Sequence, residues 1–303
     1  MSAGPASITA VPRQLKFASL TLIALATLGL WLLLKPARPL SPPQASAGLS
    51  SPQLEAIAPN RIQAALAKPG PRLNRVSAAV LPHHLPADRL IGRLVARLDP
   101  TRIKTVVLIG PDHQNKGASR FSLSRSNWAW AGQTIKTNTA VVEQLSRRPE
   151  FSVAEPVIQA EHSVLIPLPF LAEQLPEANF VLIAVKGGWD RPAAEQLAVR
   201  LAQILAPDDL VVASVDFSHQ SDLSDIAADD ERSAAALQAG TVEAVSGAAA
   251  DSPMSLAVAA AYARLRQATH VTVLEHSNSA AELNRGTNEG ITSYFTAVWQ
   301  AAE

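Results

Sequence analysis

From residue 75 onward, short apolar and β-branched runs alternate with stretches whose apolar residues recur every three to four positions. The runs are typical of buried strands, and the periodic stretches are typical of amphipathic helices. The strands predicted in this way are 76–81, 105–109, 180–185, 210–215, 271–274 and 290–299. The helices predicted from the periodicity are 87–98, 192–205, 229–238 and 254–267. The alternation predicts an α/β fold with a central mixed sheet and helices on both faces.

The N-terminal part of the chain has a different pattern, an uncharged apolar run at 17–34. Its length matches a helix that crosses a bilayer, and apolar residues occupy every face with Trp31 near one end. This favours a single transmembrane anchor over a helix of a soluble core. A cleaved signal peptide is the other alternative, since Ala45-Ser46-Ala47 has the small-x-small form. The run is longer than a signal peptide needs, so we expect an uncleaved anchor.

The chain therefore divides into four predicted parts, an N-terminal tail at 1–16, the anchor at 17–34, a Pro/Ala/Ser-rich stalk at 35–59 and an α/β domain at 60–303. Two basic residues flank the anchor on each side, so their count does not orient it. The short N-terminal tail favours a membrane protein whose domain is extracytoplasmic.

Composition narrows the function further. Hydrophobic residues make up 48% of the chain, enough for a large core, and 26 Lys and Arg residues balance 26 Asp and Glu residues. A neutral chain without a basic stripe is a poor nucleic-acid binder. The chain has no cysteine, which excludes disulfides, thiolate metal sites and a cysteine nucleophile. Any metal ion must be bound by His, Asp or Glu.

Histidines follow three of the predicted strands. His83 and His84 come after the first strand, His113 after the second and His219 after the fourth, with Asp216 close by. Ligands of open α/β sheets bind at the carboxyl ends of strands. A single histidine there is usually a surface residue, but imidazoles at three strand ends together with carboxylates favour a divalent-metal or acid–base site.

Glu161-His162-Ser163 is a fourth candidate cluster, at the entrance to the segment VLIPLPFLAEQL. Because Glu and Ser often start helices, the alternative is a capping role. His270 and His276 flank an edge-like strand, and we assign them to the surface.

Several of these segments together resemble a known family. They are Val107 to His113 (VLIGPDH), Glu161-His162-Ser163 followed by Leu168 to Leu171 (LPFL), and Ser214 to His219 (SVDFSH). They resemble the Memo family, called AmmeMemoRadiSam system protein B in prokaryotes. Pro82-His83 and the closing strand at 290–299 resemble it too, so the similarity spans roughly residues 74–300.

The resemblance implies an α/β fold shared with class III extradiol dioxygenases, which hold non-haem iron at strand ends. Carried over position by position, the two imidazole ligands are His83 and His113, an acid–base histidine is His219, a carboxylate facing the metal is Asp216, and the pair lining the pocket is Glu161 and His162.

The third ligand departs from the family, which usually has a cysteine where this chain has Ala249. Asp251 is the candidate substitute, and two imidazoles with one carboxylate suit Fe(II) first, with Mn(II), Zn(II) or Cu as the other candidate ions. The alternative is that Asp251 is the N-cap of a helix that starts at Pro253.

Three functions follow from these residues. The first is a metal-dependent oxidoreductase, dioxygenase-like, acting on a small molecule. The second is a metal-dependent hydrolase, and the third is a non-catalytic module that binds a ligand or peptide. The resemblance also implies radical-SAM and AMMECR-type system partners. The polar loops 114–122 and 278–288 are the predicted rim that selects the substrate.

Overall fold

The computed structural model describes residues 1, 4, 48–219, 223–284 and 290–302. The expected tail at 1–16, the expected anchor at 17–34 and the first part of the expected stalk fall outside these residues, apart from two positions of the tail. Within the described ranges, every helix is too short or too polar to cross a membrane.

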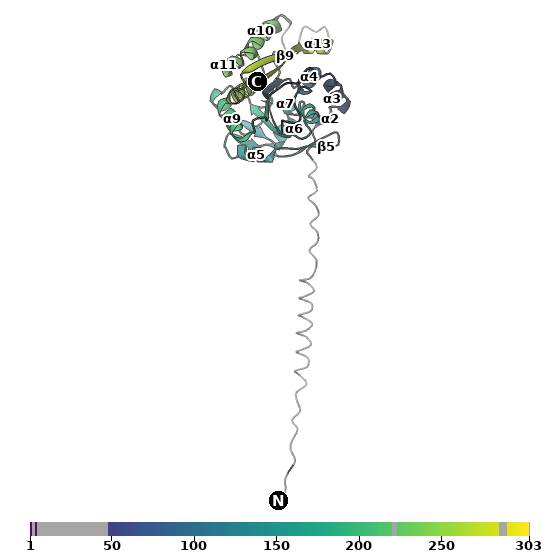
Figure 1. Ribbon diagram of the computed structural model, residues 1–303, viewed down its shortest axis with the longest axis vertical. Coiled ribbons are helices and arrows are strands. Elements are labelled where there is room, and N and C mark those ends of the chain that lie inside the picture. The colour runs from purple at the N-terminus through teal and green to yellow at the C-terminus, as the bar shows by residue number, and fades with distance from the viewer. Residues whose placement is uncertain (2–3, 5–47, 220–222, 285–289, 303) are drawn as a thin grey trace. The chain divides into compact units, whose positions relative to one another are not determined.

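The domain is built on a mixed sheet (Figure 1). Among the described residues, the eight strands of this sheet run in the order β6 (Phe151–Val153), β3 (Phe121–Leu123), β7 (Asn179–Lys186), β2 (Thr105–Asp112), β8 (Leu210–Ser214), β1 (Val76–Leu81), β10 (Ser293–Gln300) and β9 (His270–Asn278). Strands β7, β2, β8 and β1 are parallel neighbours, and β10 pairs antiparallel with both β1 and β9. A separate hairpin pairs β4 (Trp128–Trp130) with β5 (Gln133–Ile135).

Helices cover both faces of the sheet, as the sequence predicts. One face carries α2 (Pro52–Glu55), α3 (Pro59–Leu66), α4 (Asp88–Val95), α6 (Glu155–Ala160), α7 (His162–Leu165) and α8 (Leu168–Gln174). The other carries α5 (Thr139–Ser146), α9 (Arg191–Ile204), α10 (Leu223–Ala239), α11 (Val242–Val245) and α12 (Pro253–Leu265). Two short helices, η1 (Leu85–Ala87) and α13 (Ser279–Glu282), contact each other. Figure 1 shows α3 and α4 on one side of the domain and α9 and α11 on the other.

The central strands are apolar throughout because both of their faces are buried. Along β2, Val107 and Ile109 pack into the core under α9 and α12, whereas Val106 and Leu108 pack into the core under α4 and α8. Successive side chains of a strand point to opposite faces, so a strand covered twice needs no polar alternation. The predicted strand at 76–81 is confirmed with its bounds, and the other five long strands are confirmed with ends shifted by one to four residues.

The expected stalk overlaps the folded domain. Helix α2 begins at Pro52, where Ser51 accepts a hydrogen bond from the backbone N–H of Gln53. Leu54 and Ile57 are buried in the core beside α4. These two buried apolar side chains dock the segment on the domain although it is rich in Pro and Ser. The described residues from Gly48 onward form one compact unit.

Candidate metal centre

The carboxyl ends of three parallel strands bring the first site residues together. His83 lies two residues beyond β1, His113 directly follows β2, and Asp216 lies two residues beyond β8. Asp216 is buried, and its Oδ1 accepts a hydrogen bond from the backbone N–H of His83 at 3.0 Å. Because β2, β8 and β1 are neighbours in the sheet, their ends meet at one edge, as the strand-end argument predicts.

Helix α7 supplies a third imidazole from outside the sheet. Glu161 caps the helix and accepts the backbone N–H of Ser163 at 2.9 Å, so the predicted capping role is present. The hydroxyl of Ser163 donates to the carbonyl of Pro111 at 2.8 Å. This approach requires glycine at position 110, since a Cβ atom there would lie 2.5 Å from Ser163 Oγ. The close packing of α7 on the end of β2 places His162 beside the strand-end histidines.

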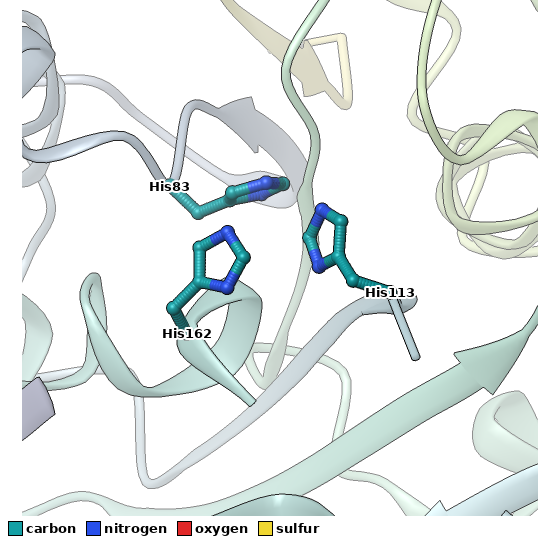
Figure 2. A group of neighbouring side chains, drawn as sticks. All are labelled: His83, His113 and His162. Atoms are coloured by element: carbon teal, nitrogen blue, oxygen red, sulfur yellow. The ribbon is translucent and has the colours of Figure 1, made fainter. Parts of the chain in front are cut away.

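His83, His113 and His162 form a compact group (Figure 2). One ring nitrogen of each lies within 4.8 Å of the chosen nitrogens of the other two. The ring centroids of His83 and His113 are 5.1 Å apart, and those of His113 and His162 are 4.2 Å apart. His83 is 1% exposed, whereas the other two are partly open to solvent. Three converging imidazoles are a set that Zn(II), Fe(II) and related ions accept.

Asp251 adds a carboxylate to the three imidazoles. Its Oδ2 lies 3.1 Å from His83 Nε2 and 3.6 Å from His113 Nε2. Both of its oxygens are buried, and neither has a hydrogen-bond partner of suitable geometry within the described chain. A buried carboxylate without hydrogen bonds is costly unless another ligand satisfies it. A buried carboxylate that faces the ring nitrogens of two histidines, beside a third imidazole, fits a metal ion.

The alternative role of Asp251 as a helix cap is wrong. Ser252 is the N-cap of α12, and its hydroxyl accepts the backbone N–H of Ser255. The backbone N–H of Asp251 instead donates to the carbonyl of Asp216 at 3.0 Å, which ties the segment to the end of β8. Ala249, where the resemblance led us to expect a cysteine, offers no ligand atom in its side chain.

The pair of His113 and Glu161 is oriented like a metal ligand and its supporting carboxylate. His113 Nδ1 lies 2.8 Å from Glu161 Oε1, and the backbone N–H of His113 donates to Oε2 at 2.9 Å. A carboxylate bonded to Nδ1 fixes the imidazole tautomer and leaves Nε2 for a ligand.

Burial and neighbouring charges separate the pKa values of the site. Burial opposes the charged form of His113, but Asp251 and Glu161 outweigh it and raise the pKa of His113 to about 10. Burial together with the neighbours His83 and His113 lowers the pKa of His162 to about 4. Burial also opposes ionisation of Asp251, yet the two histidines beside it lower its pKa to about 2. The site therefore has an ionised carboxylate, a protonated His113 and a neutral His162 at neutral pH.

The other histidines considered lie outside this group, including His276, which was assigned to the surface. His219 is exposed and interacts electrostatically with Asp251 and His84. His84 turns away from the group, with its Nδ1 2.6 Å from the hydroxyl of the buried Tyr294. His276 Nε2 lies 2.6 Å from Asp230 Oδ2.

His162 was not predicted as a metal ligand from its position after a strand, because this residue starts helix α7 instead. The signal that could have found it is the run Glu161-His162 itself. Glu161 caps helix α7 and His162 is its first residue, so both side chains lie at the helix N-terminus. This helix end packs on the end of β2 through Ser163.

A cavity of about 410 Å³ lies beside the group, with His113 and Asp251 in its wall. It gives a small molecule access to two members of the site. The fold and the site together define an α/β protein with a candidate three-histidine metal centre at the carboxyl edge of its sheet.

Comparison with known families agrees with this class. The model of the family described as Memo-like protein matches residues 43–296. The match covers most of the chain, and the protein therefore belongs to the Memo-like family.

Other comparisons add little to this assignment. A search of curated proteins finds no match. Among solved structures, the chain is similar to the crystal structure of the uncharacterized protein JW3007 from Escherichia coli K12, with 12% sequence identity and a TM-score of 0.44. This similarity covers 73% of the present chain and 99% of the other.

Proposed function

We propose that the protein is a metal-dependent enzyme that acts on a small molecule and binds one divalent ion through His83, His113 and His162. Asp251 provides a fourth ligand. The observation that carries the proposal is the group of three imidazole nitrogens within 4.8 Å of one another, beside the buried Asp251 carboxylate, whose Oδ2 lies 3.1 Å from His83 Nε2.

The donor set determines which ions suit the site. Three imidazoles and a carboxylate are borderline to hard ligands, which favour Fe(II), Mn(II) or Zn(II). Since position 249 is alanine, the thiolate that a soft Cu(I) site prefers is absent from this segment. A bound ion would act as a Lewis acid that orients and polarises the substrate or dioxygen.

Other residues of the site hold the ligands and move protons. Glu161 fixes the tautomer of His113 through the contact at Nδ1. Asp216 holds the backbone of His83. His219 is the candidate acid–base residue, since it is exposed and electrostatically linked to Asp251.

Oxidation is the reaction class that we propose first, because the motif resemblance points to the extradiol dioxygenases. Hydrolysis is the second, since a cluster of this kind also suits metal-assisted attack by water. Attachment to a membrane through 17–34, with the domain extracytoplasmic, belongs to the proposal and rests on the sequence alone. Radical-SAM and AMMECR-type partners also stay a prediction.

Metal content and turnover test the proposal together. The full chain is reconstituted with Fe(II), Mn(II) or Zn(II), and bound metal is measured by mass spectrometry for the wild type, His113→Ala and His270→Ala. His270 is an exposed histidine of β9 and serves as the control. We expect one ion per chain in the wild type and in the control, and a large loss in His113→Ala. Equal metal content in all three proteins would refute the proposed site.

The reaction class is read from the same preparations. Consumption of dioxygen that requires Fe(II) supports oxidation, whereas turnover of phosphoesters or amides without dioxygen supports hydrolysis. A protein that holds metal but turns over neither class of substrate is a binding module, and the enzymatic part of the proposal then fails.

A further inference from the structure

The cavity beside His113 and Asp251 has a second wall made by the connection between β7 and α9. This connection follows Lys186, the last residue of β7. Lys186 and the three residues after it line the cavity, together with the first residues of α12. No part of the proposed metal site explains the side chains of this wall. They therefore carry independent information about what the cavity accepts.

Two loops lock this wall in place. The N–H of Gly187 donates to Asn115 Oδ1 at 2.6 Å, and Lys186 Nζ donates to the carbonyl of Gly117 at 3.0 Å. Gly188 has a φ of 109°, which side chains other than hydrogen rarely allow. The backbone turn at this glycine leaves Trp189 at the rim, where it is 47% exposed.

Lys186 provides the positive charge of the wall. It is half-buried, and no carboxylate of the described chain forms an ion pair with its ammonium group. The two carboxylates in the cavity wall have other partners. Asp112 Oδ2 accepts the N–H of Gly117 at 2.7 Å, and Asp251 lies against the imidazoles of His83 and His113.

The start of α12 adds to this preference for negative charge. The helix begins at Pro253 and is 13 residues long, and its first residues line the cavity. The positive end of its dipole therefore faces the cavity that Lys186 also lines.

Apolar side chains form another part of the wall. Trp189 is the exposed large aromatic at the rim, and Val185 and Met254 lie deeper in the cavity. An exposed tryptophan beside apolar side chains stabilises the flat or aliphatic part of a ligand. The volume of about 410 Å³ suits a small organic molecule.

We infer that the cavity binds the substrate as a small organic anion with an apolar body, whose anionic group contacts Lys186 and whose apolar part packs on Trp189. This inference rests on the proposed function, because it names the substrate class of the same site. Lys186 and Trp189 are then specificity-determining residues and take no part in metal binding.

Benzoate and benzamide are matched probes for this inference, since they have the same shape and differ in charge. Binding to the full chain is followed by tryptophan fluorescence. Trp128, Trp130 and Trp299 are buried, so a signal that disappears in Trp189→Phe reports on the rim. The wild type is compared with Lys186→Gln and Lys186→Arg, with and without Zn(II).

We expect the wild type to bind benzoate about tenfold more tightly than benzamide. Lys186→Gln removes this preference, and Lys186→Arg keeps most of it. Trp189→Ala weakens the binding of both probes. The inference is overturned if benzoate shows no saturable binding, if the wild type does not discriminate, or if Lys186→Gln keeps the discrimination because benzoate contacts only the metal or His113.

Metal content of the same samples separates the two proposals. Lys186→Gln should retain the same amount of Zn(II) as the wild type. If the wild type binds Zn(II) but shows no preference for benzoate, the anion inference alone is rejected. If the wild type binds no Zn(II), the proposed function is rejected.

Discussion

Glu161 contacts His113 twice, with one carboxylate oxygen 2.8 Å from the ring Nδ1 and the other 2.9 Å from the backbone nitrogen. The same carboxylate also caps α7 through the N–H of Ser163. One side chain therefore holds both the His113 imidazole, just after β2, and the helix that begins with His162. This double role explains why a buried glutamate is found at the edge of the sheet.

Replacing Glu161 by glutamine should weaken Zn(II) binding by about ten- to a hundredfold, because the amide no longer holds the His113 tautomer as a carboxylate does. Competition with a chromophoric chelator measures the affinity. Glu195→Gln, which removes only an exposed pair with Arg191, is the control and should bind zinc like the wild type. An unchanged affinity in Glu161→Gln would show that the contact does not support a ligand.

His162→Ala should weaken metal binding, whereas His84→Ala should lower stability and leave metal binding unchanged. Loss of His162 removes a ligand, so we expect roughly a hundredfold weaker Zn(II) binding. His84 contacts Tyr294 outside the group, so His84→Ala should keep the metal affinity. It should lower the free energy of unfolding by about 1 kcal/mol, because the buried Tyr294 hydroxyl loses one hydrogen bond and keeps the one with Ser279. If His84→Ala loses the metal and His162→Ala keeps it, the assignment of the third ligand is wrong.

Metal binding should release protons near neutral pH. The pKa of His113 is raised to about 10 by its carboxylate neighbours, although burial opposes this, so the metal-free histidine carries a proton at pH 7. His162, with a pKa of about 4, is already neutral. A metal ion binds only the neutral imidazole, and the apparent affinity should rise by about tenfold per pH unit for each proton released between pH 6 and 8.

Calorimetry of Zn(II) binding in buffers of different ionisation enthalpy counts the released protons. We expect about one to two per ion, the second coming from His83, whose pKa is raised by Asp216 and Asp251 against the effect of burial. Heat that does not depend on the buffer, together with an affinity that is flat in pH, would contradict the protonation pattern.

Gly110→Ala should disturb the packing of α7 on β2. The added methyl group would lie 2.5 Å from Ser163 Oγ and 2.7 Å from its Cβ, so we expect a loss of about 1–3 kcal/mol in the free energy of unfolding and weaker metal binding. Gly247→Ala is the control, because its methyl group would meet only the carbonyl of Ala244, at 3.4 Å. Urea unfolding measures both variants, and equal stability would show that the close approach is not needed.

The long strands could be predicted because each carries enough consecutive buried residues to give a pattern. Strands β3 and β6 were not predicted, since three residues such as Phe121–Leu123 are too few to show a period. The short helix α2 was not predicted either, because its Pro- and Ser-rich surroundings hide the two apolar residues that dock it.

Histidines at neighbouring strand ends were predicted to meet, and His83 and His113 do meet, because parallel strands share one edge. The third imidazole could not be predicted as a ligand. Its position depends on a helix that packs against Gly110, which is a contact between segments about fifty positions apart in the sequence. Asp251 was predicted as a ligand candidate, and its burial and the 3.1 Å distance from its Oδ2 to His83 Nε2 agree with that role without testing it.

X-ray absorption spectroscopy of the full chain loaded with one equivalent of Zn(II) tests whether His83, His113 and His162 bind one ion together. We expect three imidazole nitrogens at a Zn–N distance of about 2.0–2.1 Å together with an oxygen ligand, and one imidazole fewer in His162→Ala. A zinc shell without imidazole scattering, or one that His162→Ala leaves unchanged, would contradict the claim that these three histidines hold a common ion.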